Sequence, residues 1–520
     1  MQSTLRSLLP CRIWLSRAGL LACGLALLSS GAAPAAAESS KPNIVVIMTD
    51  DQRVDDLYAG AGPTQVMPET RELIGGEGVT FTRSYASYPL SCPSRSTFLT
   101  GRLAHNHGIT ANVFPGYVYC GAPGLFPTAD SLGPWLQGAG YFTVLAGRYL
   151  NGYPSPLSLS RTTKDPGWNR FYNPVTVGRQ SAALFDEYWL NSNGEGLIPP
   201  VPGLLREDSS YFTDVMTDLV IESIEAAPAD RPVFAFLSQR APHEDDEDPE
   251  GPLPASRHGI AALAVEPPKL PSFNEPGVSD KPRTISELEP LASGERRQID
   301  LRARRRLASL RSVDDGVAEI IETLRRTGRL ENTYVFFTSD NGLFLGEHRL
   351  PKGKIRAYEQ SSRVPLMVRG PGVKPGGVSR ELVFNVDLPA TIVALSGARP
   401  TTPLDGRSLL PFMRSPGLLT GRPLLLQSYR DYSSDAVGPN PRVAAPPYQA
   451  IVRGPYKLIV LETGEAELYD LERDPHELQN VYGDRAYAAT RDYLLKELDR
   501  LRGCVGALCR AEIPAPPPTP

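Results

Sequence analysis

Three apolar runs that end in polar residues constrain the fold of this chain most. Residues 44–48 are followed by Asp50 and Asp51, while "VFAFLS" and "TYVFFTS" run into "QRAPH" and "DNG". Continuous apolar runs of this length are typical of strands that are buried on both faces of a parallel sheet. Polar groups just past the carboxyl ends of such strands commonly form the ligand site of an open α/β sheet.

Helices alternate with these strands. Before the third run, apolar residues recur at helical spacing and Gly328 provides a stop. The apolar positions are Leu310, Val313, Val317, Ile321 and Leu324. This alternation predicts the α/β class, with a large α/β/α sandwich around a mainly parallel sheet. After residue 400, short runs separated by Gly and Asp turns precede a helix predicted over 488–501. They indicate a smaller C-terminal α+β part with a short antiparallel sheet.

The first 37 residues resemble an export signal. Arg6, Arg12 and Arg17 precede an apolar stretch rich in small residues, and cleavage after Ala37 fits the small-residue rule. We therefore expect an exported protein, periplasmic or secreted, with lipidation at Cys23 as the less favoured alternative. No later stretch is expected to span a bilayer.

The remaining chain divides into three predicted parts. A catalytic domain is expected over 38–410 and a C-terminal α+β subdomain over 411–510, with a disordered proline-rich tail over 511–520. The segment 240–281 is acidic, proline-rich and aperiodic, which is too long for a simple connection, so we expect it to border the site.

Charge and cysteine content limit the expected partners and metal sites. The chain has 54 basic and 58 acidic residues and no basic run that could follow a phosphate backbone, so nucleic acid is not an expected partner. Cys504 and Cys509 are close enough in sequence to bridge in an oxidising compartment. Nothing in the spacing of Cys92 and Cys120 resembles a zinc site.

Two pairs of polar residues predict a metal site. Asp50 and Asp51 end one strand, Asp340 and Asn341 end another, and the pairs would converge if the strands are neighbours. Three carboxylates and an amide oxygen are hard ligands that suit Ca²⁺ or Mg²⁺. The structural alternative is that each pair only caps a turn at a strand end.

The segment "PLSCPSRSTFLTGR", residues 89–102, predicts a nucleophile at a helix start. A helix is expected over 93–100, with Ser91 or Cys92 just ahead of it. Free backbone N–H groups and the positive end of the helix dipole would favour an anion there, and Arg95 could neutralise it. The alternative is an ordinary N-cap followed by proline in the first turn.

These residues resemble the sulfatases, a family of the alkaline phosphatase superfamily. The family motif is Cys or Ser, any residue, Pro, Ser or Ala, Arg, then three residues and Leu-Thr-Gly-Arg, and the chain matches it in register from Ser91 to Arg102. "NIVVIMTDDQ", "SDNG" and "KGKIRAYEQSSRVPLMVRGPG" are similar to further family segments, so the resemblance spans roughly residues 41–480. "LAHNHGIT" and "LAGRYLNGY" are nearest to the glucosamine-6-sulfatase branch.

The resemblance implies a set of roles. The proline sets the register, so Ser91, not Cys92, is the residue that an anaerobic radical maturase would oxidise to formylglycine. One Ca²⁺, or less favourably Mg²⁺, would be held by the modified Ser91 and by Asp50, Asp51, Asp340 and Asn341.

Other roles are implied for the remaining site residues. Arg95 would steady the formylglycine, Lys354 would hold sulfate, and His243 would lie near the leaving oxygen. Arg148 stands where the family usually has lysine, and its planar guanidinium must make different contacts.

The implied activity is that of an exported sulfuric ester hydrolase. Its substrate would be a sulfated small molecule or glycan, such as glucosamine 6-sulfate, or an aryl sulfate. One alternative is a phosphatase or phosphodiesterase with Ser91 as direct nucleophile, which would need further histidine ligands for two zinc ions. Another is an inactive relative that binds sulfated glycans because Ser91 stays unmodified.

Overall fold

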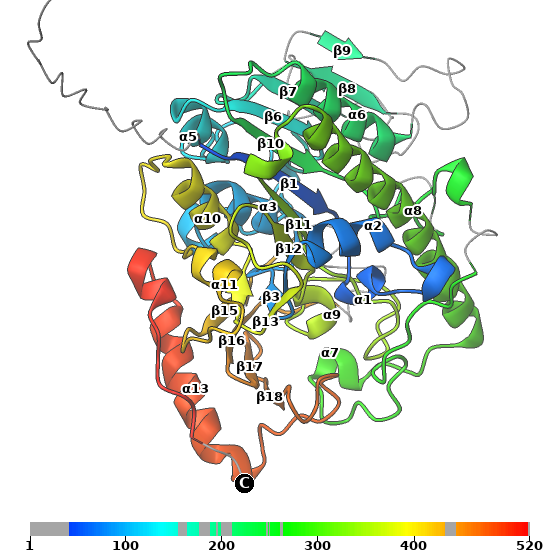
Figure 1. Cartoon of the computed structure of the whole chain (residues 1–520). Coiled ribbons are helices and arrows are strands. Elements are labelled where there is room, and N and C mark those ends of the chain that lie inside the picture. Colours follow the sequence, from blue (N-terminus) through cyan, green and yellow to red (C-terminus); the bar gives the residue numbers. More distant parts are fainter. Residues whose placement is uncertain are drawn as a thin grey trace, which may run out of the picture. The chain divides into compact units, whose positions relative to one another are not determined.

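A large mixed β-sheet forms the centre of the protein (Figure 1). The computed structural model describes residues 41–153, 164–175, 188–193, 196–198, 211–245, 248, 250–259, 264–431 and 444–517. The predicted export signal over 1–37, including Cys23, lies outside the described residues. No helix in the described ranges combines the length and the apolar composition that crossing a bilayer requires.

The sheet contains ten strands, and its central strands are parallel. From edge to edge these are β13 (Gly377–Ser379), β2 (Gly78–Phe81), β12 (Leu366–Arg369), β11 (Thr333–Ser339), β1 (Asn43–Thr49), β10 (Val233–Ser238), β6 (Phe142–Gly147), β7 (Arg170–Val175), β8 (Trp189–Ser192) and β9 (Gly196–Ile198). Strands β11, β1, β10, β6 and β7 run parallel, whereas the pairs β11–β12, β12–β2, β7–β8 and β8–β9 are antiparallel. The mainly parallel sheet predicted from the sequence is therefore confirmed.

Alternate residues of the central strands enter two separate cores. Val45 and Ile47 of β1 pack with helices on one face, and Ile44 and Val46 pack with helices on the other. The first face is covered by α6 (Phe212–Glu225) and α8 (Ser293–Arg326), and the second by α3 (Ser91–Thr100), α5 (Leu132–Gly138) and α10 (Asp387–Ser396). Figure 1 shows these helices on opposite sides of the sheet, which confirms the α/β/α sandwich.

Shorter elements connect these layers. The short helices are α1 (Val54–Leu57), α2 (Pro68–Thr70), α4 (Ala104–His107), α7 (Arg283–Ser286), α9 (Glu359–Ser362) and α11 (Leu410–Arg414). The short strands are β3 (Ser84–Tyr85) with β14 (Val383–Phe384), and β4 (Val113–Phe114) with β5 (Val118–Tyr119).

A four-stranded antiparallel sheet follows in the C-terminal part, as predicted. It is built from β15 (Leu424–Ser428), β16 (Tyr448–Arg453), β17 (Tyr456–Leu461) and β18 (Ala466–Asp470). Helix α13 (Ala488–Leu501) covers the predicted range 488–501 and buries Leu494 and Leu498 in the core of this sheet.

The predicted boundary at residue 410 falls at the first residue of a short helix. Helix α11 spans residue 410, and its Phe412 and Met413 are buried in the core beside the main sheet. Residues Lys41–Pro520 form one compact unit. The division into parts 38–410 and 411–510 therefore remains a proposal.

Residues 511–517 make defined contacts, which differs from the disorder expected over 511–520, and residues 518–520 lie outside the described residues. Ile513 donates its N–H to the carbonyl of Gly421 (2.9 Å), and Tyr493 and Thr490 of α13 donate to the carbonyls of Pro514 and Pro517. Proline lacks an N–H but keeps a carbonyl acceptor, which is the group these side chains use. Residues 513–517 are thus attached to Gly421 and to α13.

The strand register brings the predicted site segments to one edge. Thr49 of β1 pairs in parallel with Ser339 of β11, so Asp50 and Asp340 follow at the same level. On the other side of β1, Ser238 of β10 pairs in parallel with Gly147 of β6. The carboxyl ends of four neighbouring strands therefore carry the loops of the candidate site.

Candidate active site

Asp50, Asp51, Asp340 and Asn341 meet where β1 and β11 end. Asp51 accepts a hydrogen bond from the Asn341 amide (2.5 Å), and its own N–H donates to Asp340 Oδ1 (3.0 Å). All four are buried. Asp51 has φ of 67°, a left-handed conformation that non-glycine residues seldom adopt. The convergence predicted from the two strand ends is thus observed.

Two oxygen atoms of this cluster show that the site fits a cation. Asp50 Oδ1 and Asn341 Oδ1 are buried, and neither has a hydrogen-bond partner among the described residues. A buried acceptor without a partner is costly, and such atoms usually coordinate water or an ion. Carboxylate and amide oxygens are the donors that Ca²⁺ and Mg²⁺ prefer, so these residues suit one hard divalent ion.

Ser91 is the first residue of α3, two positions before the predicted helix start, and it is fully buried. Lys354 donates to Ser91 Oγ (3.2 Å) and to Asp51 Oδ1 (2.8 Å). Lys352, which also lies in "PKGK", has a side chain that is 44% exposed and that pairs with Glu244. The tertiary structure therefore places Lys354, and not Lys352, at Ser91.

Two arginines bind the carboxylates from the side of α3 and β6. Arg95 is fully buried and bridges Asp340 (Nε to Oδ2, 3.0 Å) and Asp50 (Nη2 to Oδ2, 3.1 Å). Arg148, which follows β6, donates to the same Asp50 oxygen at 2.5 Å. Both guanidinium groups thus compete for the carboxylates that could also hold a cation.

His243 belongs to the segment 240–281, which was expected to border the site. Its Nε2 lies 3.8 Å from Asp51 Oδ2, and its Nδ1 lies 2.9 Å from the carbonyl oxygen of Glu244. A carbonyl only accepts, so Nδ1 carries the proton and Nε2 faces the cluster. Burial lowers the pKa of His243 well below its ordinary value.

The buried charges change the acidity of the carboxylates in opposite directions. Burial raises the pKa of Asp50, but the positive charges of Arg148 and Arg95 outweigh it, and the net pKa lies well below the usual range. Burial and the charge of Asp50 raise the pKa of Asp340 to about 7. Carboxylates held this close repel one another, and a bound cation would relieve that repulsion.

Three supporting residues were missed from the sequence. Ser238 Oγ accepts from Arg95 Nη1 (2.5 Å) and donates to the carbonyl of Arg148 (2.5 Å). Arg306 of α8 donates to the carbonyls of Asp51 (2.6 Å) and Pro242 (2.9 Å), so it joins the loops that carry Asp51 and His243.

A signal for Arg306 exists, because it lies four residues before Leu310 on the apolar face of α8. The third missed residue is Cys120, which forms a disulfide with Cys92 directly beside Ser91. No sequence pattern marked that pair.

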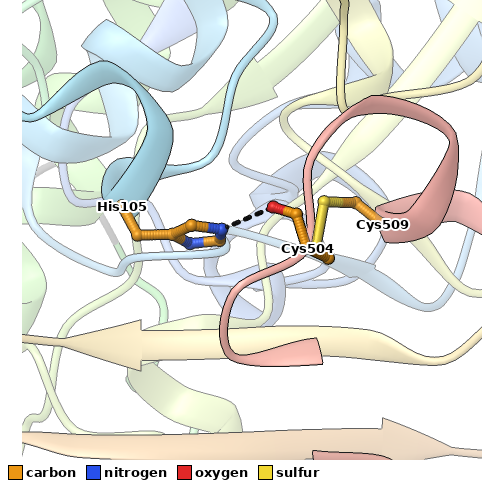
Figure 2. Close-up of side chains that lie close together, drawn as sticks. All are labelled: His105, Cys504 and Cys509. Atoms are coloured by element: carbon orange, nitrogen blue, oxygen red, sulfur yellow. Dashed lines mark hydrogen bonds between the residues drawn. A yellow bond between two sulfur atoms is a disulfide. The ribbon is translucent and has the colours of Figure 1, made fainter. Parts of the chain in front are cut away.

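A second cluster of His and Cys side chains is not a metal site. Figure 2 shows Cys504 and Cys509 joined in the predicted disulfide, which removes both thiolates as ligands. His105 Nε2 lies 2.9 Å from the carbonyl oxygen of Cys504, and Nδ1 lies 3.0 Å from Gln427 Oε1. Both ring nitrogens are therefore engaged.

Comparisons with known proteins identify the family. The sulfatase family model matches residues 42–398, and the model for the C-terminal region of N-sulphoglucosamine sulphohydrolase matches residues 346–503. An N-acetylglucosamine-6-sulfatase of Capra hircus is 30% identical over 92% of this chain and 87% of its own length. An arylsulfatase of Volvox carteri is 31% identical over 94% of this chain and 79% of its own length.

A solved structure described as a complex with the substrate D-glucosamine-2-N,6-O-disulfate has a TM-score of 0.71. It is 23% identical and covers 88% of this chain and 97% of that one. The molecule thus has an alkaline phosphatase-like fold, with the candidate site at the carboxyl edge of the sheet. More narrowly, the chain belongs to the sulfatase family and is a sulfuric ester hydrolase, and its N-acetylglucosamine-6-sulfatase relative supports the glucosamine-6-sulfatase branch.

Proposed function

We propose that this sulfatase is exported and cleaves a sulfate ester carried by a sugar, using formylglycine made from Ser91 and one Ca²⁺. The observation that carries the proposal is the position of Ser91 Oγ. It lies at the start of α3, 3.2 Å from Lys354 Nζ, beside a carboxylate and amide cluster with two unsatisfied oxygens.

The charges of the site support an anionic substrate. Three carboxylates face three permanent cations, Arg95, Arg148 and Lys354, at hydrogen-bonding distances. A divalent ion held by Asp50, Asp51, Asp340 and Asn341 would turn this balance positive. A positive, buried site attracts a sulfate ester and stabilises the charge that grows on its oxygens during cleavage.

Each side chain has a proposed part in the reaction. Formylglycine at position 91, once hydrated, would supply one hydroxyl that takes the sulfuryl group from the alcohol and a second that expels it as sulfate. Lys354 would bind a sulfate oxygen, and Arg95 would hold the modified residue 91. His243 would present Nε2 to the leaving oxygen, and Arg148 would bind sulfate with its planar head where relatives usually have lysine. Ca²⁺ would polarise the sulfate oxygens.

An unmodified serine could not finish this cycle, because a serine sulfate ester has no second hydroxyl on the same carbon to expel sulfate. The oxidation removes two hydrogens from Ser91 and needs an oxidant, which we propose an anaerobic radical maturase supplies before folding buries the residue. Two disulfides, Cys92–Cys120 and Cys504–Cys509, favour an oxidising compartment and support export.

The sugar is proposed from the named relatives. The Capra hircus relative is an N-acetylglucosamine-6-sulfatase, and the structure with a TM-score of 0.71 carries a disulfated glucosamine. We therefore propose glucosamine 6-sulfate, free or within a glycan, as the substrate class. An aryl sulfate is the second candidate, because the Volvox carteri relative is an arylsulfatase.

Mass spectrometry of the Ser91 peptide, combined with activity and metal analysis, tests the proposal. Protein from the native host should show Ser91 two hydrogens lighter, one calcium per chain, and turnover of glucosamine 6-sulfate above aryl sulfates. Ser91→Ala should abolish turnover. An unmodified serine with bound zinc and phosphodiester turnover would instead favour the phosphatase alternative, and an unmodified serine that only binds sulfated glycans would favour the inactive relative.

A further inference from the structure

A cavity among the described residues lies apart from the residues at Ser91. It has a volume of about 510 Å³ and is walled by the turns β2–β3, β13–β14 and β16–β17 together with residues that follow β18. Its basic lining residues are Arg53, Arg83, Arg363, Arg380 and Arg453, and we name it the arginine cavity. None of the proposed catalytic or metal-binding residues lines it.

The five arginines differ in their carboxylate partners. Arg53 pairs with Glu347 (2.8 Å) and Arg363 with Glu359 (3.1 Å). Within the described chain, no carboxylate lies at salt-bridge distance from the other three. Of these, Arg83 donates to the carbonyl of Gly454, Arg453 donates to that of Ile513 (2.9 Å), and Arg380 is exposed.

The acidic lining residues do not cancel this charge. Glu359 pairs with Arg363 (3.1 Å) and Lys457 (2.7 Å), and Glu381 pairs with Arg407, so both carboxylates already have cation partners. Asp55 lies 3.5 Å from Arg53. Arg53 also pairs with Glu347, so Asp55 and exposed Glu472 stand against three guanidinium groups, those of Arg83, Arg380 and Arg453. The cavity therefore carries an excess of positive charge.

The chemistry of this cavity suits an oxyanion carried on a sugar. Guanidinium groups bind sulfate and carboxylate oxygens through paired N–H donors. A volume of about 510 Å³ lies within the range of small-ligand pockets and leaves room for a saccharide unit. Arg53, in its wall, follows Asp51 by two residues, so the cavity borders the same β1 loop as the candidate active site.

We propose that the arginine cavity is a second anion site, which binds a sulfate or carboxylate group of a sulfated oligosaccharide other than the sulfate that is cleaved. The choice of an oligosaccharide rests on the proposed function. The enzyme would then discriminate between a single sulfated sugar, which uses the active site alone, and a longer anionic chain, which uses both.

Calorimetric titration with a heparin-derived tetrasaccharide tests this site without turnover. In the full-length Ser91→Ala background, Arg380→Glu should weaken binding about tenfold and reduce its salt dependence, because an anion contact is lost and a repulsion added. Arg399→Glu is the matched control, since Arg399 is also exposed but does not line the cavity. Arg380→Gln should give a smaller loss in the same direction.

Kinetics of the maturated enzyme separate this site from the active site. Arg380→Glu should raise KM for the tetrasaccharide several-fold and leave kcat/KM for glucosamine 6-sulfate unchanged. Equal tetrasaccharide affinity in Arg380→Glu and Arg399→Glu, with melting temperatures that show both to be folded, would overturn the proposal. A different outcome is that the protein binds the tetrasaccharide through Arg380 but shows no sulfatase turnover. That result would support the anion site in the arginine cavity and refute the proposed function.

Discussion

At the scale of single residues, two lysines of one short motif have opposite surroundings. Lys354 is buried against Asp51 and Ser91, and Lys352 reaches solvent beside Glu244. We expect Lys354→Ala to lower kcat/KM about 10²- to 10³-fold, because a preorganised cation would be lost from the developing sulfate charge. Lys352→Ala should stay within about twofold of the wild type, since an exposed ion pair contributes little.

Steady-state kinetics on glucosamine 6-sulfate measure both lysine variants. Equal losses in the two would contradict the assignment of Lys354, and so would a Lys354→Ala enzyme of normal activity. The spacing of the motif already favoured Lys354 through the family resemblance, but only the fold shows which lysine is buried at Ser91.

A buried histidine outside the site should limit stability in acid. His107 of α4 accepts the N–H of Ile109 at Nδ1 (3.0 Å), and burial lowers its pKa to about 3. An unfolded histidine has a pKa near 6.5, so protons favour the unfolded chain between these values. The contribution of His107 to the stability of the folded chain is complete above pH 6.5 and is lost as the pH falls towards 3.

Urea unfolding at pH 7 and pH 5 measures this effect. From pH 7 to pH 5 the free energy of unfolding of the wild type should fall by about 2 kcal/mol more than that of His107→Gln. Glutamine keeps a hydrogen-bond acceptor but does not titrate. His476→Gln, in the loop after β18, serves as the control and should follow the wild type. A parallel pH dependence of the wild type and His107→Gln would contradict the assignment.

At the scale of elements, two disulfides secure segments of different length. Cys92 at the start of α3 is bound to Cys120 after β5, across 28 residues, whereas Cys504 and Cys509 are five residues apart. Asn112, just before β4, also accepts the N–H of Cys92 (2.8 Å). Both ends of the β4–β5 hairpin are therefore attached to Cys92, the residue beside Ser91.

Removing the longer crosslink should cost more stability. On chain-entropy grounds Cys120→Ser should lower the free energy of unfolding by about 3.5 kcal/mol and Cys509→Ser by about 2 kcal/mol, because the longer loop restricts the unfolded chain more. Chemical denaturation of both variants against the oxidised wild type gives the comparison. A smaller loss in Cys120→Ser than in Cys509→Ser would argue against the longer bridge.

Much of the element layout could be predicted, because local patterns report it. The buried runs became β1, β10 and β11, and the periodic apolar residues lie in α8. The range 488–501 matches α13 because its apolar spacing and its ends are local features. The packing of Phe412 beside the proposed boundary at 410 and the contacts of Ile513 in the tail have no local signal, since they are made with residues far away in sequence.

At the scale of the whole molecule, removing the metal should weaken the contact between the loops that follow β1 and β11. The proposed ligands come from loops that are about 290 residues apart in sequence, as the Asn341–Asp51 contact shows. An ion that binds only the folded chain raises the free energy of unfolding by about 2.7 kcal/mol when its concentration is a hundredfold above its Kd. A chelator should therefore lower the melting temperature and activity together, and calcium should restore both.

Asp340→Asn is the control for chelation, because one ligand charge is removed while the side-chain shape is kept. Its melting temperature should respond to the chelator less than that of the wild type. A wild type that melts at the same temperature with and without chelator, and that contains no bound metal, would contradict the calcium proposal.

The sequence by itself determined the fold class, the family resemblance and the identity of the residues that gather at the site. Those features depend on the period of apolar residues and on short motifs, which are local. Only the tertiary structure decided that Arg306 joins the loops of Asp51 and His243, that Cys92 pairs with Cys120, and that Arg83, Arg380 and Arg453 line one cavity. Such contacts arise when the sheet brings distant segments together, so no local spacing in the chain encodes them.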